Sequence, residues 1–219
     1  MYLSTEAVSV KLYFLLTWWC KCLQNLFLAL STFFPNQTIR WGEEQAFWSN
    51  PEEIKGLRGE ISLMRPSLIG KTGQDIIATN EKGGAVSLYG LTSSIKVLFI
   101  YSYDCEHCQK EAPEMVTVYN QWKNKGVDVL ALSTDTDEAK WKAFIQNNNM
   151  TFHNALDPDR SSRYERKYHI DITPELYVLD KNNKIIASNL SPNQLPQFLE
   201  AERRRNPLFL DKPVRRLGE

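Results

Sequence analysis

Residues 96–115 read KVLFIYSYDCEHCQKEAPEM, and this stretch decides the fold. Its first eight residues, 96–103, form a nearly continuous apolar and aromatic run, which is typical of a central strand covered on both faces. Cys105 and Cys108 follow this run, and an apolar stripe with helical spacing starts at Ala112. The stretch therefore predicts a buried strand that leads into a helix, with a Cys-x-x-Cys pair at the junction.

The segments that follow alternate between strand-like and helix-like patterns. This alternation favours a largely parallel sheet with helices on both faces, and a turn at 181–183 adds an antiparallel hairpin at one edge. The predicted fold class is therefore an α/β sandwich. The strands are expected at 127–133, 151–156, 175–180 and 184–189, and the helices at 137–148, at 161–168 and from Leu195.

Composition divides the chain into four parts. Residues 1–35 are apolar, residues 36–64 read as a polar helical linker, residues 65–200 carry the alternating pattern, and residues 201–219 form a basic tail. The linker helix is expected to start at Asn50-Pro51, because Asn caps helices and Pro suits the first helical position. The central part is the expected folded domain.

The apolar segment at residues 12–34 is long enough to span a bilayer, although Lys21 interrupts it. Three interpretations remain open: a signal peptide, a membrane anchor, or a helix packed on the protein itself. Cys20 and Cys22 lie within this segment and are interpreted as small apolar fillers. The basic tail is interpreted as solvated.

The composition of the whole chain excludes several classes of protein. The 219 residues are 42% hydrophobic and 24% charged, as in an ordinary globular protein. With 26 basic and 26 acidic side chains the net charge is zero, so no nucleic-acid partner is expected. Four cysteines are too few for a disulfide-stapled miniprotein.

The position of the Cys-x-x-Cys pair points to redox chemistry. A helix N-terminus presents unpaired backbone N–H groups and a partial positive charge, which stabilise a thiolate. Cys105 is therefore expected to attack a disulfide, and Cys108, one turn inward, to resolve the mixed disulfide. A cationic His107 would lower the pKa of the attacking thiol, whereas Glu106 and Asp104 would oppose ionisation.

Two other interpretations of the pair are disfavoured. A structural zinc site needs about two further ligands, and His153 and His169 do not form a spaced pair. A static structural disulfide is the second alternative. No metal and no cofactor are expected.

The stretch CEHCQKEAPEM, together with YHIDITPELYVLD at 168–180, resembles the thioredoxin superfamily, and most of all its TlpA/ResA-like envelope thiol–disulfide oxidoreductases. The resemblance covers about residues 66–200 and implies a thioredoxin-like three-layer sandwich with a mixed sheet. It implies that Glu111 handles protons, that Pro113 kinks the active-site helix, and that Thr173-Pro174 has a cis peptide bond and binds an extended substrate segment. The segments LIGKTGQDI (68–76) and GGAVSLYGL (83–91) resemble the leading strands of the family.

Three positions depart from the family pattern. Asp104 replaces the usual aromatic residue before the first cysteine, and apolar Phe99 replaces the buried acid of thioredoxin, which shifts proton transfer toward Glu111. Glu175 follows the cis-proline, where Thr is common, and is expected to disfavour the thiolate or to favour basic substrates.

The leading hypothesis is a thiol–disulfide oxidoreductase that acts on protein disulfides, with an upstream electron donor or acceptor protein. The resemblance places it on the periplasmic side of the bacterial cell envelope, where residues 12–34 would tether it to the membrane. One alternative is a peroxiredoxin-like peroxidase, although Leu98 occupies the position where that chemistry needs a proline. The other is a non-catalytic binding module with the same fold.

Overall fold

The computed structural model describes residues 51–205. The apolar segment at 12–34, with Cys20 and Cys22, and most of the basic tail lie outside the described residues. The chain divides into two compact units, residues 1–62 and 63–219. The described residues of the first unit belong to helix α3 (Pro51–Met64), so the polar linker is helical in this part. Within residues 51–205, no helix is both long and apolar enough to cross a membrane.

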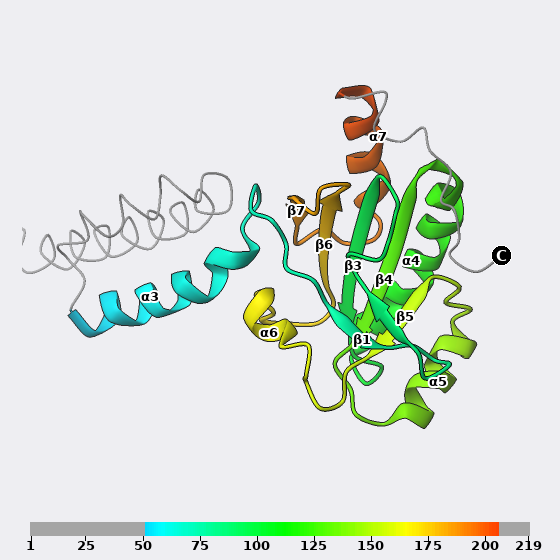
Figure 1. Ribbon diagram of the computed structural model, residues 1–219, viewed down its shortest axis with the longest axis horizontal. Helices are drawn as coiled ribbons and strands as arrows, with labels where there is room; N and C mark the ends of the chain where they lie inside the picture. Colours follow the sequence, from blue (N-terminus) through cyan, green and yellow to red (C-terminus); the bar gives the residue numbers. More distant parts are fainter. Residues whose placement is uncertain (1–50, 206–219) are drawn as a thin grey trace, which may run out of the picture. The chain divides into compact units, whose positions relative to one another are not determined.

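The second unit is built on one mixed sheet of seven strands in the order β2-β1-β5-β4-β3-β6-β7. The central strands β3, β4 and β5 are parallel, and the other neighbours pair antiparallel (Figure 1). The predicted α/β sandwich with a mixed sheet is confirmed. The strands are β1 (Ile77–Thr79), β2 (Ala85–Ser87), β3 (Ile95–Tyr101), β4 (Val127–Ser133), β5 (His153–Leu156), β6 (Glu175–Asp180) and β7 (Ile185–Ser188).

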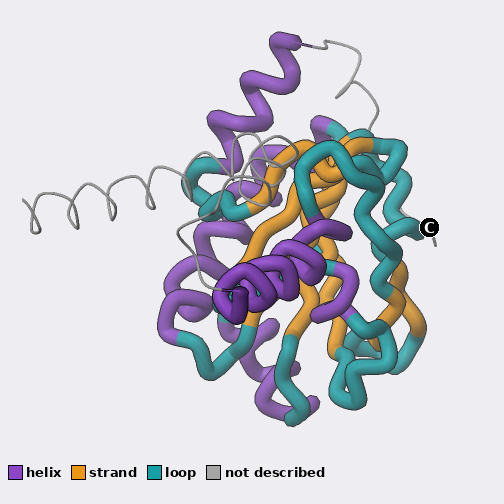
Figure 2. The backbone as a smooth tube through the Cα atoms, turned by 90° about the vertical axis from the view of Figure 1, so that its left-hand side faces the viewer, coloured by secondary structure: helices purple, strands orange, loops and turns teal. Residues whose placement is uncertain are grey.

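Helices and loops cover the two faces of the sheet. One face packs against the long helices, and the other packs against one short helix and the segments that precede β1 and β3. Figure 2 shows the strands running through the middle of the domain. The helices on the first face are α4 (Glu106–Trp122), α5 (Glu138–Asn147) and α7 (Leu195–Arg205). The helix on the second face is α6 (Tyr164–Lys167). Two short 3-10 turns complete the described elements, at Arg65–Ser67 and Lys123–Lys125.

Strand β3 is the centre of the core. All seven of its residues are buried, as its nearly continuous apolar run predicts, and the charged Lys96 is buried with them. Alternate side chains enter opposite faces, so Phe99 and Tyr101 pack toward α4 while Leu98 packs on the other face. The Trp141 indole N–H donates to the Tyr101 hydroxyl over 3.0 Å, which satisfies both buried polar groups. This covered strand fixes the point at which the Cys-x-x-Cys pair emerges.

The segment 68–76, expected to contain a leading strand, is mostly irregular. It forms only an isolated bridge between Thr72 and Lys184, and regular pairing starts at Ile77. Gly70 has φ +90°, and a Cβ on Gly73 would lie 2.6 Å from the Leu179 side chain. The left-handed backbone and this close approach interrupt the pleat, so the prediction was wrong for this segment.

The helix expected at 161–168 is reduced to the single turn α6. The Asp157 carboxylate accepts hydrogen bonds from the backbone N–H groups of Ser161 and Ser162, which holds these residues in a loop. Arg163 has φ 53°, and the helix can start only after it. These hydrogen bonds from the backbone to Asp157 therefore prevent the longer helix that the apolar periodicity predicts.

Candidate active site

The Cys-x-x-Cys pair lies at the junction of β3 and α4, as predicted. Cys105 is the N-cap residue of α4 and is partly exposed, whereas Cys108 is fully buried in the core beneath it. Both are free thiols. The Cys105 Sγ donates to the carbonyl oxygen of Thr173 over 3.1 Å, and the Thr173-Pro174 bond is cis. Strand β3, helix α4 and the loop before β6 thus bring four predicted site residues together.

Burial raises the pKa of the Cys105 thiol, but hydrogen bonds outweigh burial and the pKa lies below its ordinary value. The largest opposing contributions come from the backbone N–H and the thiol of Cys108, followed by the Thr173 side chain and the His107 backbone N–H. The two backbone N–H groups are the donors that the N-terminus of α4 provides. The side-chain tuning expected of Asp104, Glu106 and His107 is not among these causes and stays a prediction.

Cys108 has the opposite electrostatic environment. The pKa of its thiol is raised to about 12; burial is the largest cause, and the Cys105 sulfur acts in the same direction. The Ser102 backbone N–H, 3.5 Å from the Cys108 Sγ, works against this shift. The pair therefore combines an accessible sulfur that ionises easily with an inaccessible sulfur that keeps its proton. This asymmetry suits one nucleophile and one resolving residue.

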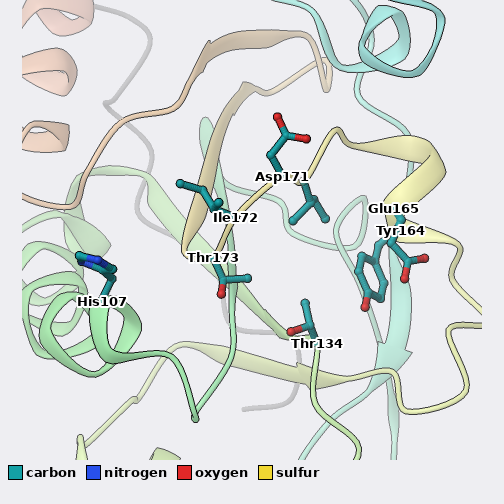
Figure 3. A pocket seen from close by; sticks show the side chains of 8 residues that line it. His107, Thr134, Tyr164, Glu165, Asp171, Ile172 and Thr173 are labelled. Carbon is teal, nitrogen blue, oxygen red and sulfur yellow. The ribbon is translucent and has the colours of Figure 1, made fainter. Parts of the chain in front are cut away.

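A pocket of about 590 Å³ is lined by His107 and by Thr173, the residue whose carbonyl oxygen contacts Cys105 (Figure 3). In Figure 3, His107 of α4 lies on one side of Thr173, and Tyr164 of α6 lies on the other. The wall also contains apolar and acidic groups, including Ile172, whose side chain is 73% exposed. Thr173 of the cis-proline loop thus forms part of the pocket wall and also contacts Cys105. The remaining lining residues are Thr134, Glu165, Ile170 and Asp171.

Glu111 lies on α4, one turn beyond Cys108. Burial, followed by the charge of Glu114, raises the pKa of its carboxyl group, and His107 lowers it. Neither cysteine is among the groups that shift this pKa. The helix therefore places Glu111 three residues beyond Cys108, and its role in proton transfer stays a prediction.

Glu175 is the first residue of β6, directly after Pro174. It pairs with Ile100, so its side chain lies on the face of Leu98 and Tyr177 rather than on the face of Cys108. The expected effect on the thiolate has no counterpart among the causes that shift the pKa of Cys105. Burial raises the pKa of the Glu175 carboxyl itself to about 7.

Sequence reasoning missed Asp135 and its partner Ser102. The Asp135 carboxylate accepts hydrogen bonds from the hydroxyls of Ser102 and Ser133 and from the Tyr103 backbone N–H, each over 2.8 Å. The available signal was topological: Asp135 follows β4 by two residues, and Ser102 directly follows its parallel neighbour β3. The carboxyl ends of parallel neighbours meet at one edge of a sheet.

Comparison with known proteins gives consistent matches. Over 118 residues, 54% of this chain and 67% of the relative, the chain is 28% identical to a Bacillus cereus protein named thiol-disulfide oxidoreductase ResA. A domain of a possible thiol-disulfide isomerase from Cytophaga hutchinsonii matches with a TM-score of 0.59 and 29% identity, covering 63% of this chain and 95% of that one. The thioredoxin domain of a thiol-disulfide oxidoreductase from Bacteroides vulgatus matches with a TM-score of 0.58 and 27% identity, covering 61% and 96%.

The pattern of the AhpC/TSA family matches residues 69–188, which is more than half of the chain. The matched region runs from the segment before β1 through β7 and contains Cys105, Cys108 and the cis-proline loop. The predicted resemblance to thioredoxin-fold, ResA-like proteins is thereby confirmed, and the chain belongs to the AhpC/TSA family.

Proposed function

We propose that this chain is a thiol–disulfide oxidoreductase that acts on protein disulfides, with Cys105 as the attacking residue and Cys108 as the resolving residue. One observation carries the proposal: Cys105 is accessible and has a lowered pKa, whereas Cys108 is buried and has a raised pKa. The relatives named thiol-disulfide oxidoreductase support the same activity.

The first step is attack of the Cys105 thiolate on one sulfur of a substrate disulfide. The substrate S–S bond breaks, a mixed disulfide forms at Cys105, and the released substrate thiolate takes up a proton from water. The Thr173 carbonyl faces Cys105, so an extended substrate segment can pair with the backbone of the cis-proline loop. In this proposal Thr173 and Pro174 bind substrate backbone rather than take part in bond exchange.

The second step releases the substrate in its reduced form. The Cys108 thiol loses its proton, its sulfur attacks the Cys105 sulfur, and the second substrate thiolate leaves. The substrate disulfide has gained two electrons and the Cys105–Cys108 pair has lost two. A dithiol of an upstream donor protein must therefore reduce the pair before the next cycle. The reverse direction would use an upstream acceptor.

The bacterial cell envelope, on its periplasmic side, is part of the same proposal. Structural disulfides form and persist in oxidising compartments, where a protein with this activity finds its substrates. The apolar segment at residues 12–34 and the ResA-like relatives support this location. That segment is also the proposed membrane tether.

The proposed function is tested by following reduction of a peptide disulfide by a chemical dithiol with and without the chain. We expect catalytic amounts to accelerate the reduction, and the oxidised chain to contain one Cys105–Cys108 disulfide whose reduction potential can be measured. A rate equal to that of the dithiol alone would refute the proposal. Rapid peroxide consumption by a Cys108→Ser variant would instead establish the peroxidase alternative.

Glu111 gives a first testable prediction. Because burial raises the pKa of its carboxyl group, Glu111 is a stronger base than an ordinary carboxylate and is suited to accept the Cys108 proton. We expect Glu111→Gln to slow the resolving step about tenfold, below the usual range for a general base, because solvent also reaches this carboxyl. Stopped-flow measurement of resolution checks this. Glu138→Gln is the matched control, because this exposed carboxylate of α5 pairs with Lys142 over 2.7 Å and is not among the groups that shift the pKa of Glu111. It should leave the rate unchanged, and equal effects of the two variants would remove the special role of Glu111.

A further inference from the structure

Asp135 ties the loop before the nucleophile to the neighbouring strand. Its Oδ1 accepts from the Ser102 hydroxyl, and its Oδ2 accepts from the Tyr103 backbone N–H and the Ser133 hydroxyl, all over 2.8 Å. Three short bonds to one ionised acceptor are individually strong. The carboxylate therefore fixes both residues that lead from β3 toward Cys105.

Ser102 carries this restraint to the cysteines. Its backbone N–H donates to the Cys108 Sγ over 3.5 Å, and its hydroxyl also accepts from the Asp104 backbone N–H over 3.2 Å. The first contact stabilises negative charge on the resolving sulfur, and it leads the effects that lower the pKa of Cys108. The position of one backbone amide thus affects how readily Cys108 becomes a thiolate.

We infer that Asp135 is a positioning residue for the resolving half of the reaction, acting through Ser102 on Cys108. This inference rests on the proposed function, since resolution has meaning only if Cys105 forms a mixed disulfide. Asp135 touches neither sulfur in the described contacts. It holds the Ser102 backbone N–H where the Cys108 thiolate forms.

A direct effect of the Asp135 charge would have the opposite sign. A negative carboxylate close to the sulfurs disfavours thiolates, so its removal would then speed both steps. Asp135 is not among the groups that shift the pKa of Cys105 or Cys108. Positioning, in contrast, predicts that removal slows resolution and leaves the attack nearly unchanged. The two accounts are separated by the direction of the change.

The experiment uses the full chain with Cys20→Ser and Cys22→Ser, so that only the active-site thiols react. An excess of Ellman's reagent, a chromogenic aromatic disulfide, releases one aromatic thiolate when Cys105 attacks. A second is released when Cys108 resolves the mixed disulfide, and this phase is independent of reagent concentration. We expect Asp135→Ala to slow the second phase about tenfold, the change in thiolate fraction for one pKa unit. The rate of the first phase should change less than about twofold, because the pKa of Cys105 is expected to stay nearly the same.

Three further variants make the test specific. Ser102→Ala removes one of the three bonds and should slow the second phase to a lesser extent. Asp135→Asn keeps an acceptor oxygen and should recover part of the lost rate. Asp137→Ala removes the N-cap of α5, which accepts from the Ala139 and Lys140 backbone N–H groups, and should lower stability without slowing resolution.

The outcomes distinguish this inference from the proposed function. The chain that carries only Cys20→Ser and Cys22→Ser is the reference chain. If it gives no second phase, the proposed function fails. If it gives both phases and Asp135→Ala resolves at the reference rate, only the role of Asp135 is refuted. Faster resolution in Asp135→Ala would also refute positioning and would indicate a charge effect. Equal slowing of the second phase by Asp137→Ala would show that the slower resolution in Asp135→Ala reflects lost stability, which would refute positioning.

Discussion

Turnover of a protein disulfide should fall at least about 10³-fold in Cys105→Ser, because a serine hydroxyl does not ionise near neutral pH and the thiolate is the nucleophile. The structure makes this loss specific to one sulfur. Cys105 is the partly exposed cysteine, its pKa is lowered, and it contacts Thr173 in the cis-proline loop. The assay is reduction of a peptide disulfide by a chemical dithiol, with the variant and the unsubstituted chain compared at equal concentration.

Cys108→Ser should fail at the other half of the reaction. Cys105 can still attack, but no second sulfur is available to release the substrate, so a mixed disulfide accumulates. Non-reducing electrophoresis and mass spectrometry of the trapped species check this, with Cys20→Ser and Cys22→Ser as the common background. Accumulation of the adduct in Cys105→Ser instead would reverse the assigned roles. Full turnover in either variant would contradict the two-cysteine mechanism.

The sequence predicted the parts of the fold that depend on long apolar patterns. Residues 95–101 are buried on both faces of the sheet. In an α/β domain, a nearly continuous apolar run of this length is typical of a central strand. The pair of cysteines at the strand end then located the partly exposed thiol and the helix whose N-terminal backbone N–H groups lower its pKa. These inferences depend on neighbours in sequence, which a single chain shows directly.

The parts that were missed depend on contacts between distant segments. Asp135 approaches Ser102 only because β3 and β4 are parallel neighbours, and the sequence carries no local mark of that contact. The short helix α6 was overestimated because Asp157 captures the backbone of Ser161 and Ser162. Apolar periodicity reports burial, but it does not report which polar side chain holds a loop.

Glu175→Gln should raise the free energy of unfolding by about 2 kcal/mol at pH 8 and change it little at pH 4.5. Burial, the largest cause, raises the pKa of the folded-state carboxyl from 4.5 to about 7, and its Oε1 is buried without a hydrogen-bond partner. The Asn189 backbone N–H lowers this pKa, but it does not offset burial. The negative charge of Asp171 raises the pKa further toward its final value. The side chain keeps some solvent contact, which reduces the penalty below that of a fully buried charge.

The sign of this pH dependence follows from the raised pKa. Below about pH 4.5 the carboxyl is protonated in both states, so it does not affect the balance. Between pH 4.5 and 7 the unfolded chain releases the proton while the folded chain retains it, so stability falls as pH rises. Above pH 7 the folded protein contains a partly desolvated charge, and the penalty is complete. Glutamine keeps the shape and removes this ionisation.

Urea unfolding at pH 4.5 and pH 8 measures the effect, since the midpoints of the two proteins should converge at the lower pH. Glu165→Gln is the matched control, because the Glu165 carboxylate pairs with Arg160 over 2.9 Å at the surface instead of being buried without a partner. Its effect should be small and similar at both pH values. If Glu175→Gln instead destabilises the protein equally at both values, the Glu175 carboxylate has a strong partner in the folded state. In that case burial does not govern its ionisation.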